Sequence, residues 1–401
     1  MSHPSARTAS AASCQWSPRT SPAAPPSASW PVASARPESR LGKGATRRPL
    51  RIALVAPPWF PLPPRGYGGI EAVVHLLGTQ LREMGHRVTT FAAEGSDPRL
   101  RAVSMAPDDW SEDLGTSTQA VREATYEVRV NQELKERRHE FDVVHLHTEF
   151  PGMACASLLG FDLPRLATVH GGISEEVVTF LEEVDEEIDL IAISKAQRKQ
   201  APNVRWLAVV HNAIRVDDFA VEDGKDGYLV QLARITPDKG QHIAIEVAER
   251  VGMPLVLAGK VDRDAKSRRY FTELIEPRLS GKVRWIEDVR GEERAKLLGR
   301  AAALLFPIQW EEPFGLAMVE AMASGTPVVA FGRGAARELV EPGVTGYLAR
   351  SVDELVERVR QVGEIDPERC AERARDRFSP RRMAARYARA YRNSLKNALA
   401  G

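Results

Sequence analysis

The chain has 401 residues, of which 43% are hydrophobic and 27% are charged, and its formal net charge at pH 7 is +1. These values are ordinary for a globular protein with enough chain for two domains, and they exclude a broad basic surface for nucleic acid. The three cysteines, Cys14, Cys155 and Cys370, lie far apart without metal-ligand spacing, so we expect a reduced, cytoplasmic protein. No apolar run reaches the length of a membrane-spanning helix.

Residues 1–48 differ from the rest of the chain in composition. They are rich in Ser, Ala, Pro and Arg, and they contain no apolar run that would indicate a signal peptide. Such a segment cannot bury enough apolar surface to offset its conformational entropy. We therefore expect a disordered N-terminal extension, with a misassigned upstream start codon as the alternative explanation.

Residues 49–212 show the alternation that is typical of an α/β domain. The segment "RIALVA" at 51–56 is a nearly continuous apolar run, which suits a strand buried on both faces. Residues 69–86 have helical spacing of their apolar side chains. Further strands are predicted at 87–93, 142–147, 164–170 and 189–194. This alternation predicts βαβ units with helices on both faces of a parallel sheet.

A second alternating series occupies residues 226–375. The polar stretch at 211–227, rich in Gly and Asp, predicts a linker between the two series. Residues 379–399 predict a long amphipathic helix that is rich in arginine. Within 226–375 we predict strands at 227–234, 254–259, 282–286, 302–308 and 326–331, and helices at 239–251, 265–279 and 315–324.

The loops at strand ends are the places to search for a site, because open α/β sheets bind ligands beyond the carboxyl ends of their strands. The first such loop lies in "PPRGYGGIEAVV" (63–74) and places Gly68 and Gly69 before a helix. Glycines allow the backbone to approach a ligand closely, and a helix N-terminus attracts an anion. An ordinary βα turn explains this loop equally well.

Two further loops carry cations and a histidine. In "QLARITPDKGQ" (231–241), Arg234 and Lys239 follow a strand and could neutralise a diphosphate, although two solvated side chains would give the same pattern. In "ATVHGG" (167–172), His170 ends a strand and could donate a hydrogen bond to a substrate hydroxyl or carbonyl. A histidine that is bonded to nearby backbone is an equally good interpretation.

The loop "EEPFG" places two acids, Glu312 and Glu320, around the start of a helix. The backbone N–H groups of Phe314, Gly315 and Leu316 are then expected to point into the cleft between the domains. An ordinary surface helix explains Glu320, because an acid near a helix N-terminus is stabilised by about 0.3–1 kcal/mol. It does not explain Phe314, which would stand exposed in such a turn.

In this combination and order, the motifs resemble those of the family 4 retaining glycosyltransferases, which have the GT-B fold. The spacing from Glu312 to Glu320 is similar to the E-x7-E signature of that family, and "ARITPDKG" resembles its diphosphate motif. "ATVHGG" and "GYGGIE" resemble its histidine motif and its N-terminal glycine loop. The resemblance covers residues 51–395 and is strongest toward the branch of avilamycin-type transferases.

The resemblance implies an α/β protein of two Rossmann-like, doubly wound domains that face each other across a cleft. Residues 49–212 would form the N-terminal acceptor domain, and residues 226–375 the C-terminal nucleotide-sugar domain. The helix at 379–399 would cross back and pack on the N-terminal domain.

Four side chains are implied to be catalytic. Glu312 would hold hydroxyls of the donor sugar and support the reacting centre. Arg234 and Lys239 would bind the diphosphate and stabilise it as it leaves. His170 would touch the sugar from the opposite domain.

The resemblance also implies a set of donor-binding residues. Glu320 would bind the nucleotide ribose, and Gly68 and Gly69 would lie beside the phosphates and the acceptor. The remaining donor contacts would come from Arg234, Lys239, Glu312, Phe314, Gly315 and Leu316.

We expect neither a metal nor another cofactor, because fixed cations and N–H dipoles can stabilise a departing diphosphate. The donor is expected to be UDP-glucose, with GDP-mannose left open, and the acceptor to be a small metabolite, a glycan or a lipid. A weak peripheral membrane contact through the Arg-rich last helix is a further possibility, although a solvated or domain-bridging face explains its arginines as well. The alternatives for the whole chain are a GT-B nucleotide-sugar epimerase and a non-catalytic GT-B-like subunit that binds sugar nucleotides.

Overall fold

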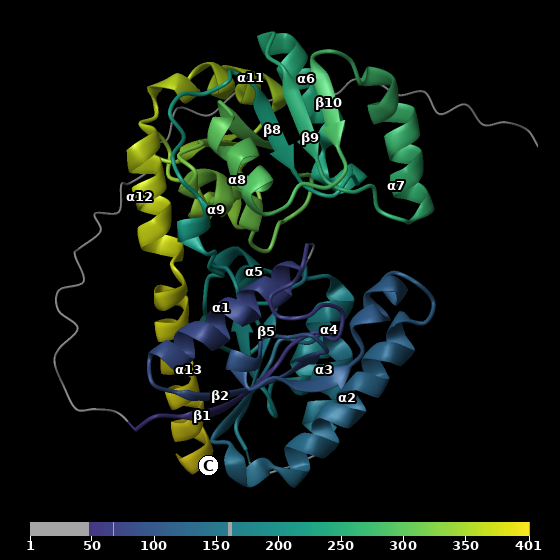
Figure 1. The fold of residues 1–401 in the computed structure, drawn as a ribbon, viewed down its shortest axis with the longest axis vertical. Helices are drawn as coiled ribbons and strands as arrows, with labels where there is room; N and C mark the ends of the chain where they lie inside the picture. The colour runs from purple at the N-terminus through teal and green to yellow at the C-terminus, as the bar shows by residue number, and fades with distance from the viewer. Residues whose placement is uncertain (1–47, 67, 159–162, 401) are drawn as a thin grey trace, which may run out of the picture. The chain divides into compact units, whose positions relative to one another are not determined.

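The computed structural model describes residues 48–400, apart from residue 67 and residues 159–162. The expected N-terminal extension lies outside these described residues, except for Arg48. Two all-parallel sheets, each with helices packed against it, make up the described chain (Figure 1). Each is a doubly wound, Rossmann-like unit, which confirms the expected α/β fold class.

The N-terminal sheet has seven strands in the order β3-β2-β1-β4-β5-β6-β7. Its strands are β1 (Arg51–Val55), β2 (Arg87–Ala93), β3 (Val103–Ala106), β4 (Val143–Leu146), β5 (Arg165–Val169), β6 (Asp189–Ala192) and β7 (Trp206–Val209). Its helices are α1 (Gly69–Glu83), α2 (Gln119–Glu136), α3 (Phe150–Leu158), α4 (Glu175–Val184) and α5 (Lys195–Gln200).

The C-terminal sheet has six strands in the order β10-β9-β8-β11-β12-β13. Its strands are β8 (Leu229–Leu232), β9 (Leu255–Ala258), β10 (Val283–Ile286), β11 (Ala303–Phe306), β12 (Val328–Phe331) and β13 (Gly346–Ala349). The helices are α6 (Gln241–Val251), α7 (Ala265–Tyr270), α8 (Gly291–Arg300), α9 (Leu316–Ala323), α10 (Ala336–Leu339), α11 (Val352–Arg360), α12 (Pro367–Phe378) and α13 (Pro380–Ala400).

The central strands are buried on both faces, as their continuous apolar runs predict. In β1, Ile52 and Leu54 pack into one apolar cluster, whereas Ala53 and Val55 pack into the cluster on the opposite face. All four side chains are fully buried. Helices on both faces are therefore needed to cover this sheet, and the alternating sequence supplies them.

Helix α13 belongs to the core of the N-terminal domain, although it follows the last helix of the C-terminal one. Its residues Met383, Tyr387 and Tyr391 are buried in the same apolar cluster as Ile52. The Tyr391 hydroxyl lies 2.9 Å from Nδ1 of His145 on β4. The expected return of the last helix to the N-terminal domain is thereby confirmed, and its position beside α1 can be followed in Figure 1.

Each sheet has one point at which the strand order reverses, and the predicted motifs lie there. In the N-terminal sheet, the reversal lies between β1 and β4, which pair from Ile52 to Val55. In the C-terminal sheet, it lies between β8 and β11. Ligands of doubly wound folds bind in the crevice outside these strand ends, so each domain offers one place for a ligand.

The helix predicted at 265–279 is interrupted. It is α-helical only to Tyr270 and continues through a π-helical segment and a 3₁₀ turn that contains Pro277. Proline lacks the N–H of a helix interior and clashes with the preceding turn, so the α-helix cannot run through this position.

Two other helices begin one or two residues later than predicted. Helix α6 begins at Gln241, because Gly240 has a left-handed φ of 70°. Helix α9 begins at Leu316, because Gly315 has a φ of 90°. Both glycines make the sharp turn that brings a site loop into a helix N-terminus.

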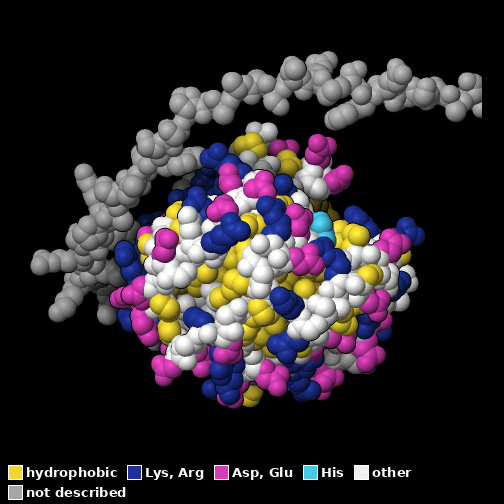
Figure 2. All heavy atoms as spheres, turned by 90° about the horizontal axis from the view of Figure 1, so that it is seen from above, with side chains coloured by type: hydrophobic (Ala, Val, Ile, Leu, Met, Phe, Trp, Pro, Cys, Tyr) yellow, Lys and Arg dark blue, Asp and Glu magenta, His cyan; other side chains and the backbone are white. Residues whose placement is uncertain are grey.

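Among the described helices, none combines the length and the apolar composition that crossing a bilayer requires. On the face drawn in Figure 2, basic and acidic side chains are interspersed. This mixture agrees with the net charge of +1. The exposed arginines of α13 include Arg381, Arg382 and Arg389.

Candidate functional site

The loop that carries Arg234 and Lys239 is held rigidly at the end of β8. The side-chain amide of Gln231 donates to the carbonyl of Lys239 over 2.6 Å, and that of Gln241 donates to the carbonyl of Arg234 over 2.8 Å. A Cβ on Gly240 would lie 2.3 Å from the carbonyl oxygen of Pro307, at the end of β11. The loop therefore packs directly against the next strand, and only glycine fits at this position.

Lys239 and Glu312 form an ion pair at the same place. Their Nζ and Oε2 atoms are 2.7 Å apart, and their side chains are 12% and 14% exposed. The Lys239 ammonium also lies 4.7 Å from the centroid of the Trp310 ring. The structure thus brings together Lys239 of the "QLARITPDKGQ" loop and Glu312 of the "EEPFG" loop, which are remote in sequence.

Arg234 is near this pair in the chain, but its side chain has another partner. Its guanidinium donates to Asp262 over 2.5 Å, and it is 47% exposed. Burial raises the pKa of Asp262, and the charge of Arg234 opposes that rise. Asp262 follows β9 and was not predicted as part of the site, because nothing in its local sequence distinguishes it.

Glu320 is similarly held by an arginine. Nε of Arg294 on α8 donates to Oε2 of Glu320 over 2.9 Å, and the Glu320 side chain is 12% exposed. Sequence reasoning missed Arg294, since it stands in an ordinary charged helix, "GEERAKLLGR". The neighbouring acid Glu311 has a structural contact, because its Oε2 accepts from the N–H of Gly334 over 2.6 Å.

Phe314 does not stand exposed, as an ordinary surface turn would require. Its side chain is only 2% exposed and packs edge-on against Phe378, with the ring centroids 6.0 Å apart. The apolar residue in this turn is therefore explained by core packing. Gly315 caps α9 without a side chain, so the first N–H groups of that helix have no side-chain acceptor from their cap.

His170 lies at the end of β5, partly buried beside the fully buried His145 and His147. Its Nε2 is 2.9 Å from Nδ1 of His147, and burial lowers the pKa of His170 to about 3, so the ring is neutral. It lines a pocket of about 150 Å³ with His147. A Cβ on Gly172 would lie 2.6 Å from the Trp310 ring, so the histidine loop closely approaches the loop of Glu312.

The described residues contain no group of three or more His, Cys, Asp or Glu side chains that could hold a metal ion.

The glycine loop before α1 has a strained backbone and close neighbours. Gly68 has a φ of 142°, and a Cβ there would lie 2.7 Å from Cβ of Pro64. A Cβ on Gly69 would lie 3.3 Å from Cδ1 of Leu316, the first residue of α9. Gly68 and Gly69 therefore lie on the side of the N-terminal domain that approaches the start of α9.

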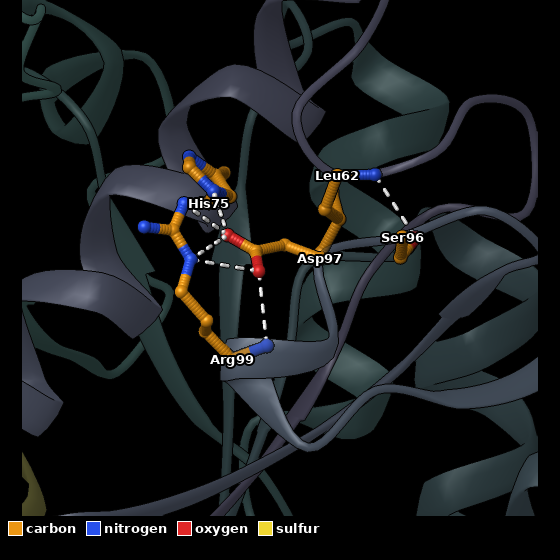
Figure 3. Close-up of polar contacts among 5 residues, drawn as sticks. All are labelled: Leu62, His75, Ser96, Asp97 and Arg99. Carbon is orange, nitrogen blue, oxygen red and sulfur yellow. Dashed lines mark hydrogen bonds and ion pairs between the residues drawn. The ribbon is translucent and has the colours of Figure 1, made fainter.

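A polar network fixes the proline-rich loop that leads into these glycines (Figure 3). The N–H of Leu62 donates to Oγ of Ser96 over 2.9 Å, and the N–H of Asp97 donates to the Leu62 carbonyl over 2.7 Å. Asp97 also accepts from Arg99 and contacts Nε2 of His75 on α1 at 3.1 Å. Hydrogen bonding to Arg99 holds the pKa of Asp97 well below its usual range. The network ties α1 and the loop before it to the end of β2.

Comparison with protein families and known proteins agrees with this geometry. Residues 67–217 match the model of Glycosyltransferase Family 4, and residues 215–377 match that of Glycosyl transferases group 1. The chain is 28% identical to a glycogen synthase of Mycobacterium tuberculosis over 379 residues, which cover 81% of this chain and 89% of that protein.

Solved structures share the fold. AviGT4, a glycosyltransferase involved in avilamycin A biosynthesis, is 26% identical with a TM-score of 0.67, covering 87% of this chain and 98% of its own. Anabaena HepE, solved with UDP-glucose, has a TM-score of 0.66 at 18% identity, covering 86% of this chain and all of its own. The two family matches together span both domains. The chain therefore belongs to the family 4 glycosyltransferases of GT-B fold and is a hexosyltransferase.

Proposed function

We propose that the chain transfers a glucosyl group with retention of configuration from UDP-glucose to an acceptor bound by the N-terminal domain. The observation that carries this proposal is the ion pair of Lys239 and Glu312 at the switch point of the C-terminal sheet. The pair holds a cation and a carboxylate within one hydrogen bond of each other, which supports a role for the first in binding phosphate and for the second in binding sugar. HepE, which shares the fold, was solved with UDP-glucose, and this makes UDP-glucose the first donor to test.

In this proposal, the cations stabilise the departing diphosphate. Cleavage of the bond between the sugar and the diphosphate places negative charge on the leaving group, which preorganised cations stabilise in the transition state. An ammonium has three N–H donors, so Lys239 can keep its bond to Glu312 and still donate to a phosphate oxygen. Arg234 is half-exposed, and its guanidinium can exchange Asp262 for the diphosphate.

The donor sugar is held from several sides. Glu312 accepts hydrogen bonds from its hydroxyls and stabilises the positive charge that develops at the reacting carbon. The backbone N–H groups of Phe314, Gly315 and Leu316, at the uncapped start of α9, donate to the sugar or its phosphate. His170, whose lowered pKa of about 3 keeps the ring neutral, donates a hydrogen bond from the N-terminal domain.

Glu320 binds the hydroxyls of the nucleotide ribose. Its carboxylate is oriented by Arg294, which donates to only one of its two oxygens, Oε2. The other oxygen remains suited to accept from a vicinal diol. Gly68 and Gly69 lie between the acceptor and the phosphates, where the lack of side chains allows close approach.

The cations supply the stabilisation that a divalent metal supplies in other transferases, so we propose that no metal is required. The experiment is a screen of UDP-glucose, UDP-galactose and GDP-mannose with the purified protein, measuring thermal stabilisation and hydrolysis with and without EDTA. UDP-glucose should raise the melting temperature most and be hydrolysed at an unchanged rate in EDTA. Stabilisation by GDP-mannose alone would reject the donor, and a complete loss of turnover in EDTA would reject the metal-independent mechanism.

A further inference from the structure

A second pocket lies at the switch point of the N-terminal sheet, where β1 and β4 end. It has a volume of about 180 Å³ and is lined by the loop after β1, the start of α1, one face of α2 and the start of α3. Drug-sized ligands occupy pockets of about 300–1,000 Å³, so this one fits a single small ring. Gly68 and Gly69 form part of its wall, which places it beside the proposed donor site.

The polar lining of this pocket is acidic. It contains Glu71 of α1, Glu123 and Glu127 of α2, and Glu149 before α3. Among the described residues that line it, none is a lysine or an arginine. Glu71 and Glu127 are only 4% and 2% exposed, so their carboxyl groups are removed from solvent.

One carboxylate oxygen of Glu127, Oε2, lacks a hydrogen-bond partner among the described residues, and Glu127 is more than nine-tenths buried. The hydroxyl of Thr148, also buried, lies beside the same carboxyl group and lowers its pKa by hydrogen bonding, which burial outweighs. Gly152 packs directly against both residues, since a Cβ there would lie 2.0 Å from Oγ1 of Thr148 and 2.7 Å from Oε1 of Glu127, so no larger residue fits at this position. Buried polar atoms are nearly always hydrogen-bonded in proteins, so this arrangement is incomplete without a ligand.

A buried carboxylate without a cation is unfavourable. Burial raises the pKa of Glu71 to about 7 and that of Glu127 to about 8. Such groups become stable anions only when a positive charge is brought beside them. A ligand that carries an ammonium group supplies that charge, whereas a phosphorylated or carboxylated ligand supplies none and finds no lysine or arginine in the described lining.

The rest of the lining suits the apolar face of a ring. Trp59, which is 7% exposed, and Phe60 border the pocket together with Pro57. Aromatic faces pack against sugar rings and also attract cations. The pocket therefore combines a surface for stacking with acids for hydroxyl and ammonium groups.

We propose that this pocket is the acceptor subsite and that it binds an amine-bearing sugar or cyclitol ring, with Glu127 and Glu71 as the carboxylates that recognise the ammonium. The inference rests on the proposed function, because it takes the pocket beside Gly68 as the acceptor side of a transfer reaction. It excludes acceptor units that carry a phosphate at the bound ring.

The experiment measures binding of four small probes to the full-length protein by calorimetry at neutral pH, without a donor. The probes are D-glucosamine, 6-amino-6-deoxy-D-glucose, D-glucose and D-glucose 6-phosphate, which differ mainly in one substituent. At least one amino sugar should bind about tenfold more tightly than glucose, and glucose 6-phosphate should not bind measurably. Equal affinity for glucose and both amino sugars, no binding of either amino sugar, or binding of the phosphate as tight as that of an amino sugar would each overturn the proposal.

Variants locate the effect in this pocket. Glu127→Gln keeps the shape of the side chain, removes its charge, and should reduce the amino-sugar preference about tenfold; Glu71→Gln is the second variant if the first does not fold. Glu136→Gln, an exposed glutamate on the same helix, should leave the preference unchanged. A preference that survives both pocket substitutions would show that the amine binds elsewhere, which also overturns the assignment. UDP binding measured on the same samples reports on the donor site, so a failure there is distinguishable from a failure of the acceptor inference.

Discussion

The acids at the two switch points of this protein differ in their partners. In the C-terminal domain, Glu312 is paired with Lys239 and Glu320 with Arg294. In the N-terminal domain, the acids of the second pocket have no basic residue among the described residues that line it, and Oε2 of Glu127 has no hydrogen-bond partner. The two sheets share the order of their first six strands and differ by one added edge strand in the N-terminal sheet, so the difference arises from the side chains that each sheet places at its switch point.

This difference separates the kinds of ligand that the two sites can accept. A paired acid holds a cation in place, and that cation retains donors for an anionic group such as a diphosphate. An unpaired buried acid instead favours a ligand that brings a positive charge or a hydrogen-bond donor. One domain is therefore suited to the nucleotide and the other to a partner without negative charge.

The largest effect is expected when the cation of the Lys239–Glu312 pair is removed. Lys239→Ala leaves Glu312 unpaired at 14% exposure and removes a charge from the proposed diphosphate site. By analogy with the loss of one donor from a preorganised electrostatic site, kcat should fall about 100- to 1,000-fold. Steady-state release of UDP from UDP-glucose measures the effect.

The matched control for this change is Lys296→Ala. Lys296 is an exposed lysine on α8 that also pairs with a glutamate, Glu292. Its removal should leave kcat unchanged. If Lys239→Ala retained a normal kcat, or if both variants lost activity equally, the pair at the switch point would have no special role.

The position of Lys239 and Glu312 at one edge of the sheet could be predicted from the sequence. Lys239 and Glu312 stand in loops after apolar runs, and parallel strands place such loops at one edge of a sheet. The alternation of apolar runs with helical spacing also predicted five strands of each sheet, but it located only five of the thirteen α-helices in the described chain and missed β3, β7 and β13. Resemblance to a family then supplied the roles that spacing alone could not.

The partners of these residues could not be predicted in the same way. Arg294 lies on α8, and Asp262 lies in the loop after β9. Only tertiary packing brings Arg294 to Glu320 and Asp262 to Arg234. The packing of Phe314 could not be predicted for the same reason, since its partner Phe378 lies at the end of α12. Glu71 stands inside the motif "GYGGIE", but it is only 4% exposed, and burial of an acid by tertiary packing could not be read from the motif.

Removing Arg294, the partner of Glu320, tests whether ion pairing also matters for binding of the nucleotide. Arg294→Ala leaves Glu320 without its guanidinium, so the carboxylate loses the orientation proposed for binding the ribose. We expect the KM for UDP-glucose to rise about tenfold while kcat changes little, because this contact is made equally in the ground state and the transition state. Arg300→Ala removes an exposed arginine from the same helix and should not change KM. A fall in kcat without a change in KM would place Arg294 in the chemical step instead.

The unpaired acid Glu127 should make the stability of the folded protein depend on pH. The pKa of Glu127 in the folded protein is about 8, above its ordinary value of 4.5, so the folded state binds more protons than the unfolded state between these values. The contribution of Glu127 is therefore fully present below pH 4.5 and is lost as the pH rises through about 8. Glu127→Gln should melt close to the wild type in acid and roughly 2–4 °C above it in alkali. Thermal unfolding followed by circular dichroism tests this, and a constant difference across the pH range would contradict it.

The smallest effect is expected for an acid that is paired but lies outside both sites. Glu338 on α10 contacts Nε2 of His211 at 3.2 Å and accepts from the N–H groups of Lys195 and Ala196 at 3.2 and 3.1 Å. Burial would raise the pKa of Glu338, but these hydrogen bonds outweigh it and the net shift is downward. Its stabilising contribution is therefore present above its ordinary pKa and is lost as the pH falls through the lower value.

Glu338→Gln should accordingly cost about 0.5–1 kcal/mol at neutral pH, and this cost should disappear in acid. Glu357→Gln, which removes an exposed acid paired with Arg360, should have no effect at either pH. Kinetics of the same variants complete the comparison. Because Glu338 lies outside both proposed sites, kcat and KM should stay within about twofold of the wild type, whereas a large kinetic loss would extend the functional site to this contact between α10 and α5.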